Sequence, residues 1–169
     1  MKSMVFLVLS LCAWASALPA VAPVQPKAFS GLWYEIARTY NDYEKNCVAA
    51  TVEYKLKQND AYDVTNRCFD KKIGADLIVY NGTGKTLIPN SASKLKLTYF
   101  WVFSREYHIV HWDESYAVMA SPDLAQLWIM SRTPQMPQNK LDTILTKLSS
   151  VMDTKKLIFT PQDAKGRYQ

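Results

Sequence analysis

The sequence predicts an all-β domain in which short antiparallel strands close into a barrel and one helix packs outside it. Alternating apolar and polar residues recur from Trp33 to Arg132, with turn-forming residues between the runs. Helical spacing of apolar residues appears only after Pro137. Eight or nine strands of this kind must protect their edges from pairing with other chains, and closure into a barrel does so.

The composition is that of an ordinary globular protein. The chain has 169 residues, of which 49% are hydrophobic and 21% charged, enough for one domain with a full core. The formal net charge is +5, but basic residues adjoin only as pairs such as Lys71-Lys72 and Lys155-Lys156. We therefore expect no nucleic-acid partner.

The N-terminus has the features of an export signal. Lys2 precedes an apolar stretch too short to span a bilayer, and Ala15-Ser16-Ala17 has the small-x-small form that signal peptidase cuts after. We expect three segments, a signal peptide (1–17), an N-terminal extension (18–28) and a β-barrel domain (29–169).

Export implies a periplasmic or secreted protein. Cys12 leaves open a second alternative, a lipid-anchored form at the outer membrane, although Leu9-Ser10-Leu11 puts leucine where such a site normally has a small residue. No later stretch is apolar enough to span a membrane.

The first strand is expected from Trp33 to about Thr39. Strict alternation would place Trp33, Glu35 and Ala37 on one face and Arg38 on the other. Glu35 would then sit near the floor of the barrel, where a buried carboxylate serves either as a base or as a structural group.

The next two strands are expected to form a hairpin around the polar turn Lys57–Asp60. One strand alternates Val52 and Tyr54 with polar residues, and the other does the same with Tyr62 and Val64. Matching these apolar faces pairs Val52 with Val64 and Tyr54 with Tyr62.

Two cysteines remain in the mature chain, Cys47 and Cys68. In an exported protein such a pair most often forms a disulfide, here worth about 3 kcal/mol in the chain-entropy model. The hairpin register puts Cys68 opposite Val48, so a bulge or a curl in the first of the two strands must bring Cys47 round.

The stretch Gly82–Thr86 matches a phosphate-binding loop only in part, because Val79 stands where that motif needs a glycine and no helix follows. A turn or an irregular strand is expected instead, after a strand at Asp76–Tyr80. Asn81-Gly82-Thr83 is also a glycan acceptor pattern, which has meaning only in a eukaryotic secretory route.

Four further strands are expected, at Lys94–Phe100, Tyr107–Trp112, Tyr116–Ala120 and Leu127–Arg132. Ser104–Glu106 would be the turn after the first of them. Apolar residues spaced i, i+3, i+4 and i+7 from Leu141 predict an amphipathic helix, which can lie against the outside of the sheet. Leu157–Phe159 would be a short closing strand.

Patterns for catalysis or metal binding are weak. His108 and His111 lie three apart in a strand, so they should point to opposite faces and not share a metal. We assign no catalytic residue, no metal and no cofactor.

Three stretches carry a family resemblance: Gly31-x-Trp33, Tyr107 through Ala117, and Leu127 through Pro134. In order and spacing they resemble the lipocalins, and most closely the bacterial lipocalins and apolipoprotein D. The resemblance implies an eight-stranded up-and-down antiparallel barrel with one C-terminal helix outside. It also implies a cup that binds lipids such as fatty acids and lysophospholipids.

The same resemblance suggests roles for individual residues. Gly31, Trp33 and Arg132 would be structural, with the Arg132 guanidinium packed across the Trp33 indole at the floor of the barrel. Tyr54, Asn66, Tyr116 and Trp128 match positions that line the pocket. The full set of expected ligand contacts is Val52, Tyr54, Val64, Asn66, Leu97, Tyr116 and Trp128.

We therefore expect reversible binding of a small hydrophobic ligand, for transport, sequestration or lipid maintenance in the cell envelope. Residues 99–103 form an aromatic cluster where the mouth should be, which either docks on a membrane or a partner or packs its own loop. A homodimer is left open separately. The alternatives are a lipocalin-fold isomerase or synthase that uses a free cysteine, and a tetrapyrrole carrier, against which the want of a well-placed histidine argues.

Overall fold

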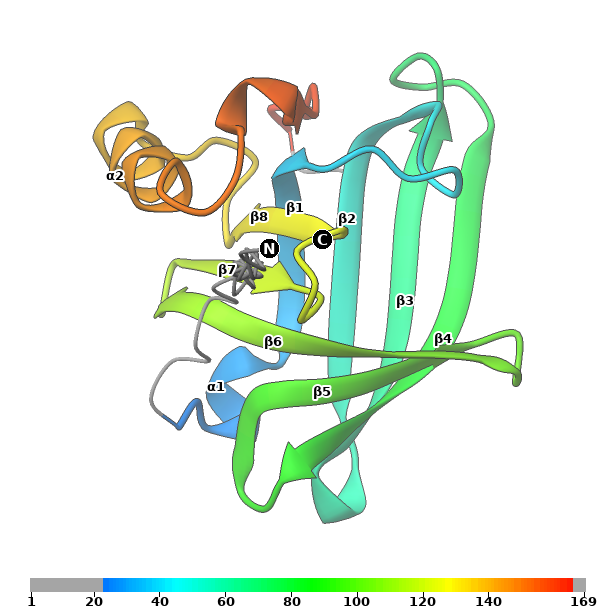
Figure 1. Ribbon diagram of the computed structural model, residues 1–169. Coiled ribbons are helices and arrows are strands. Elements are labelled where there is room, and N and C mark those ends of the chain that lie inside the picture. Colours follow the sequence, from blue (N-terminus) through cyan, green and yellow to red (C-terminus); the bar gives the residue numbers. More distant parts are fainter. Residues whose placement is uncertain (1–22, 166–169) are drawn as a thin grey trace, which may run out of the picture.

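The computed structural model describes residues 23–165 (Figure 1). The expected signal peptide and Cys12 lie outside these residues. The helices and strands are α1 (Pro26–Phe29), β1 (Gly31–Arg38), β2 (Cys47–Leu56), β3 (Ala61–Asp70), β4 (Leu77–Ile88), β5 (Ser91–Tyr99), β6 (Phe103–Asp113), β7 (Tyr116–Ala120), β8 (Leu127–Ser131), α2 (Gln138–Leu148) and β9 (Ile158–Phe159), with short 3-10 turns at Gln58–Asp60 and Thr154–Lys156.

The strands form a closed barrel. Each strand from β2 to β8 pairs antiparallel with the next, β8 pairs with β1, and β1 pairs in turn with β2, for example Trp33 with Val52. The short β9 lies beside β1 outside this ring. The expected eight-stranded up-and-down barrel is therefore confirmed, with one extra strand and with α2 as the main helix.

One end of the barrel is plugged by its own side chains. Helix α1 lies at this end in Figure 1, and Phe29 is fully buried with its ring 4.8 Å from that of Tyr54 and 6.0 Å from that of Trp112. Val24 is also buried, and its carbonyl accepts from the amide of Ala92. Within the expected N-terminal extension (18–28), Val24 and Pro26 are thus buried against the barrel.

The expected amphipathic helix lies outside the barrel. In α2, Leu141, Ile144 and Leu148 are buried and pack in one cluster with outward-facing side chains such as Val118 and Ile129. The charged face of the helix remains exposed to solvent. Helix α2 lies against one side of the barrel, away from its two ends (Figure 1). Within residues 23–165, no helix combines the length and apolarity needed to cross a membrane.

The β2–β3 hairpin differs from the expected register by two residues. Val52 pairs with Asn66, and Tyr54 pairs with Val64. A shift of two keeps each side chain on its expected face, because strand faces alternate with a period of two. A bulge interrupts the pairing after Val48, and Cys47 is joined to Cys68 by a disulfide, as expected.

The expected turn at Ser104–Glu106 is wrong, and Gly82–Thr86, for which a turn or an irregular strand was expected, is strand. Gly82–Thr86 belongs to one long strand, β4, which pairs with both β3 and β5 and has a register shift after Thr86. Ser104–Glu106 likewise belongs to β6, whose pairing with β5 reaches the tip where Tyr99 faces Phe103. The reversal lies between them, where Phe100 and Trp101 both have positive φ angles (50° and 67°). Two adjacent left-handed residues build the tight turn, with no glycine to signal it in the sequence.

Bulges also change which side chains face inward. In β1 the pairing with β8 shifts between Glu35 and Ala37, so Arg38 is turned into the barrel beside Glu35 while Ala37 packs outward. In β6 a shift after Ile109 leaves His111 stacked on Tyr116 beneath α2. The expectation that alternation alone decides these faces is therefore wrong for Ala37 and Arg38.

Candidate functional site: a cavity at the open end of the barrel

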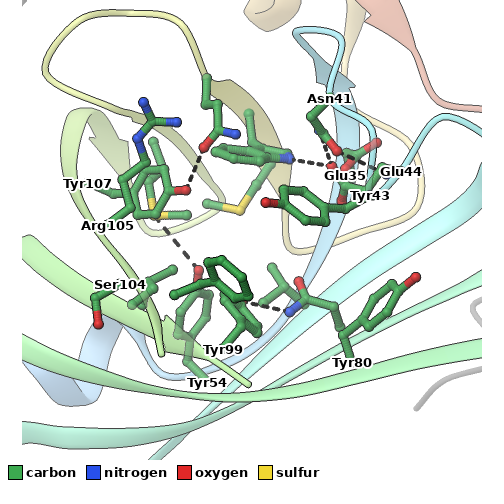
Figure 2. Close-up of a pocket in the computed structure, with 18 of the residues that line it drawn as sticks. Glu35, Asn41, Tyr43, Glu44, Tyr54, Tyr80, Tyr99, Ser104, Arg105 and Tyr107 are labelled. Atoms are coloured by element: carbon green, nitrogen blue, oxygen red, sulfur yellow. Dashed lines mark hydrogen bonds between the residues drawn. The ribbon is translucent and has the colours of Figure 1, made fainter. Parts of the chain in front are cut away.

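The end of the barrel opposite α1 contains a cavity of about 440 Å³ (Figure 2). Strands β1 to β8 supply its wall, and the loops between β1 and β2, β5 and β6, and β7 and β8 supply its rim. Most of the wall is apolar or aromatic. The lining residues include Val52, Tyr54, Asn66, Tyr80, Leu97, Tyr99, Phe103, Tyr107, Met119, Trp128 and Met130. A cavity of this size and lining is typical of sites for small apolar ligands.

Five of the seven expected ligand contacts line this cavity: Val52, Tyr54, Asn66, Leu97 and Trp128. Val64 faces inward but lies nearer the closed end of the barrel, in its aromatic core. Tyr116 lies on the outer face, under α2, because its neighbours Ala117 and Met119 take the inward positions of β7. Neither Val64 nor Tyr116 contributes to the cavity wall.

Three tyrosine hydroxyls and their partners form the polar part of the wall. The Tyr99 hydroxyl accepts from Asn66 Nδ2 at 2.8 Å, and the Tyr107 hydroxyl donates to Gln126 Oε1 at 2.6 Å. The Tyr54 hydroxyl has the weak acceptor Met119 Sδ at 3.8 Å. Burial raises the pKa of Tyr54 and Tyr99 above the usual range and that of Tyr107 to about 12. All three therefore remain neutral hydrogen-bonding groups.

A buried charged cluster borders another part of the cavity, and its two carboxyls, Glu35 and Glu44, belong to the wall. Arg38 Nε lies 3.2 Å from Glu35 Oε1 and 3.8 Å from Glu44 Oε2. Glu44 Oε2 also accepts from Asn41 Nδ2 at 2.6 Å and from Trp128 Nε1 at 3.0 Å. Figure 2 shows Asn41, Glu35 and Glu44 gathered on one side of the cavity. These contacts anchor the β1–β2 loop against the barrel.

Glu35 is the carboxyl of this cluster whose pKa is shifted upward. Its side chain is 5% exposed, and Thr160 Oγ1 donates to Glu35 Oε1. Burial and the neighbouring Glu44 carboxylate raise the pKa of Glu35 well above its usual range, and the opposing effects of Thr160 and Arg38 are smaller. When Glu35 is protonated, the charges of Arg38 and Glu44 compensate each other.

The remaining charged residue of the wall is Arg105, at the rim. Its Nη2 lies 3.3 Å from Asp123 Oδ2, and both side chains are about half exposed. Next to it, the tip of the β5–β6 hairpin presents Trp101, which is 98% exposed, and Val102, which is 74% exposed. The rim of the cavity thus carries large apolar side chains in contact with solvent.

The three residues with an expected structural role meet at the closed end. Arg132 Cζ lies 3.5 Å from the centre of the Trp33 ring, and Arg132 Nη1 donates to the Leu32 carbonyl at 2.9 Å. Gly31 has a φ of 97°, and a Cβ there would lie 3.3 Å from Arg132 Nη1. A side chain at Gly31 would be strained by its backbone angle and crowded by the arginine.

The groups on which alternative chemistry depends are engaged elsewhere. Cys47 and Cys68 are joined in a disulfide, so neither has a free thiol that could act as a nucleophile. His108 Nε2 lies 2.6 Å from Glu106 Oε1. Between residues 23 and 165, no group of three or more His, Cys, Asp or Glu side chains is placed to hold a metal ion.

Sequence reasoning missed several residues of the wall. Tyr99 continues the inward alternation of Leu95 and Leu97, so the pattern could have placed it in the cavity. Glu44 lies in a loop and Arg38 follows a bulge, and neither has a periodic signal. The charged cluster was therefore visible only in the structure.

Comparisons with known proteins agree with this geometry. The model of a family described as a lipocalin-like domain matches residues 24–162. The chain is 29% identical over 140 residues to the outer membrane lipoprotein Blc of Vibrio cholerae, covering 79% of this chain and 80% of that protein. It is 31% identical over 160 residues to apolipoprotein D of Macaca fascicularis, covering 83% and 80% of the two chains.

A solved structure shares the fold at lower identity. The allergen Per a 4 from cockroaches superposes with a TM-score of 0.69 at 19% identity, over 91% of this chain and 99% of the other. At this level of identity the likeness concerns the barrel and its helix, and the site must be interpreted from its own residues.

Proposed function

The chain belongs to the lipocalin family, and on that premise we propose that it binds one small hydrophobic ligand reversibly in the cavity at the open end. The observation that carries this proposal is the 440 Å³ space itself, which the strands enclose and the closed-end core does not fill. Each methylene of an acyl chain buried there contributes about 0.8 kcal/mol. Eight buried methylenes therefore offset part of the entropy cost of association.

The ligand class that we propose is a single-chain lipid. Fatty acids and lysophospholipids are the first compounds to test, because their acyl chain matches a wall built from Val52, Leu97 and Met119. Transport or sequestration of such lipids in the cell envelope would agree with the export signal and with a relative named as an outer membrane lipoprotein. A periplasmic or secreted location is our first choice, and a lipid anchor at Cys12 is the alternative.

We propose that binding involves no chemical step. An isomerase or synthase of this fold would need a thiolate, and Cys47 and Cys68 are both oxidised in the disulfide. Titration of the non-reduced mature protein with a thiol reagent tests this directly. No reactive thiol from these two positions is expected, and two would reopen the enzyme hypothesis.

The rim suggests where the ligand is exchanged. We propose that Tyr99–Phe103 makes a peripheral contact with a membrane, because Trp101 and Val102 extend into solvent directly beside the cavity. A lipid could then pass between bilayer and barrel without crossing open water. A homodimer through the same tip remains a competing proposal, which sedimentation of the purified protein would test.

Binding itself is tested by filling the cavity from within. Leu97→Trp puts an indole into the wall of β5, whereas Lys96→Trp puts the same side chain on the exposed outer face of that strand. We expect Leu97→Trp to lose most of its affinity for the neutral fluorescent probe N-phenyl-1-naphthylamine and Lys96→Trp to keep it. Equal affinities in the two variants would contradict the site.

A further inference from the structure

We infer that the cavity selects lipids with a neutral, hydrogen-bonding head, such as a fatty alcohol or a monoacylglycerol, over free fatty acids. This inference rests on the proposed function and names the head group that the site accepts. Its basis is the balance of charge and of hydrogen-bonding groups along the cavity wall.

The wall offers no spare positive charge to a buried carboxylate. Among the described lining residues, the carboxylic acids are Glu35 and Glu44, and the basic side chain is Arg105. Arg105 lies at the solvent-exposed rim and is paired with Asp123. Two of these three side chains are carboxyls. The third, Arg105, is the single cation among them and is already paired with Asp123.

Arg38 does not change this balance. It is 2% exposed and is not part of the cavity wall, and its guanidinium lies against both Glu35 and Glu44. Its Nη2 also donates to the backbone carbonyl of Glu44. Its Nη1 has no hydrogen-bond partner within residues 23–165, but the guanidinium is buried and does not line the cavity. A ligand carboxylate placed in the cavity would therefore add a second negative charge beside Glu44 in a poorly solvated space.

The wall does provide groups for an uncharged head. Tyr99 accepts from Asn66, so its own hydroxyl proton is free to be donated to an ester or alcohol oxygen. The Tyr54 hydroxyl faces the Met119 thioether, a weak acceptor that a ligand oxygen can replace. The Glu44 carboxylate can in turn accept from a ligand hydroxyl. A neutral head thus gains hydrogen bonds without a charge penalty.

The test compares two ligands of equal chain length on the wild-type protein. Lauric acid and dodecanol each displace N-phenyl-1-naphthylamine at mildly alkaline pH, where free laurate is ionised. We expect dodecanol to bind about tenfold more tightly or better, as one unfavourable charge contact in a partly desolvated site implies. Monolaurin, a neutral ester with two hydroxyls, should behave like dodecanol.

Glu44→Gln identifies the cause. Glutamine keeps an oxygen for Asn41 and Trp128 but removes the negative charge, so the ratio of the dodecanol to the laurate affinity should fall about tenfold. Asp42→Asn is the matched control, because Asp42 is an exposed carboxylate of the same loop that does not line the cavity. Its affinity ratio should equal that of the wild type.

The possible results separate the two proposals. If laurate binds as tightly as dodecanol, or more tightly, the head-group inference is overturned while ligand binding stands. If no ligand displaces the probe, the proposed function fails and the inference fails with it. The wild-type comparison decides the matter even if Glu44→Gln does not fold.

Discussion

Arg38 Nε lies 3.2 Å from Glu35 Oε1 on the inner side of β1, although the two residues are three apart in a strand. The bulge between Glu35 and Ala37 makes this pairing possible. It places a cation between two carboxyls, Glu35 and Glu44, and so lets a loop residue be held inside the barrel. The charged cluster consequently joins the strand that opens the fold to the loop that borders the cavity.

The first prediction concerns the pH dependence of folding. Burial raises the pKa of Glu35 above its value of about 4.5 in the unfolded chain, so the folded state binds the proton more tightly. The resulting stabilisation is complete below pH 4.5 and is lost as the pH rises through the higher pKa of the folded state. Glu35→Gln cannot titrate at this position, so its free energy of unfolding should not show this decrease with pH. The stability of the variant relative to wild type should therefore improve as the pH rises.

Urea unfolding of wild type and Glu35→Gln at acid, neutral and alkaline pH measures this difference. Glu114→Gln, which changes an exposed carboxyl in the β6–β7 turn, is the control for a general charge effect. A constant difference between Glu35→Gln and wild type across the pH range would show that Glu35 does not hold a proton in the folded protein.

The second prediction concerns the closed end. Arg132 stacks on Trp33 and donates to the carbonyls of Leu32 and Ala28, at 2.9 Å and 2.7 Å. Arg132→Met removes a cation–π contact and three charge-assisted hydrogen bonds, the third to the Phe29 carbonyl at 3.3 Å, and should lower the free energy of unfolding by about 2–4 kcal/mol. Arg132→Lys keeps the charge but not the planar fork, so its loss should be smaller.

Urea denaturation of the two variants gives these values, and probe binding serves as the control. Because the cavity lies at the other end of the barrel, affinity for N-phenyl-1-naphthylamine should stay near the wild-type value while the protein is folded. A wild-type midpoint for Arg132→Met would mean that Trp33 needs no cation over it.

The sequence could predict most of the barrel because strand alternation records which residues are buried. It placed Val52, Tyr54 and Asn66 on the inner face even though the hairpin register was displaced by two residues, since an even shift preserves the face. Bulges break that periodicity, and apart from the cysteine pair, which required a bulge or a curl near Cys47, the pattern contains no signal for them. Arg38 was therefore assigned to the wrong face.

The charged part of the site was harder to predict for the same reason. Glu44 lies in a loop, where no periodic pattern relates a residue to the core. Its contact with Trp128 joins residues far apart in sequence, and its contact with Arg38 depends on the bulge in β1. Tyr116 is a different case. Family position suggested the pocket, and because every residue of β7 is apolar and buried, alternation could not distinguish its inner face from its outer face.

The third prediction uses two glycines of β4 that face the interior. A Cβ on Gly82 would lie 2.6 Å from Tyr99 Cδ1 and 2.7 Å from the Thr98 carbonyl oxygen, whereas a Cβ on Gly84 would lie 3.1 Å from Leu97 Cδ2. Gly82→Ala should therefore displace Tyr99 and cost about 1–3 kcal/mol of stability, with a smaller loss for Gly84→Ala.

Ligand affinity should separate the two variants further, since Tyr99 forms part of the cavity wall. We expect weaker dodecanol binding by Gly82→Ala than by Gly84→Ala, measured by probe displacement under conditions where both are folded. The reverse order would indicate that the Tyr99 side chain has no part in ligand binding.

The last prediction concerns the β5–β6 tip. Trp101 is 98% exposed, and transfer of a side chain of this size from water to a bilayer interface is worth about 1.5–3 kcal/mol. Trp101→Ser should therefore weaken binding to vesicles of phosphatidylcholine and phosphatidylglycerol about tenfold or more. Leu87→Ser is the matched control, because Leu87 is also exposed but lies at the far end of β4, away from the cavity. Co-sedimentation with the vesicles measures both variants, and a loss of equal size in the two would assign binding to general surface hydrophobicity instead of to the rim.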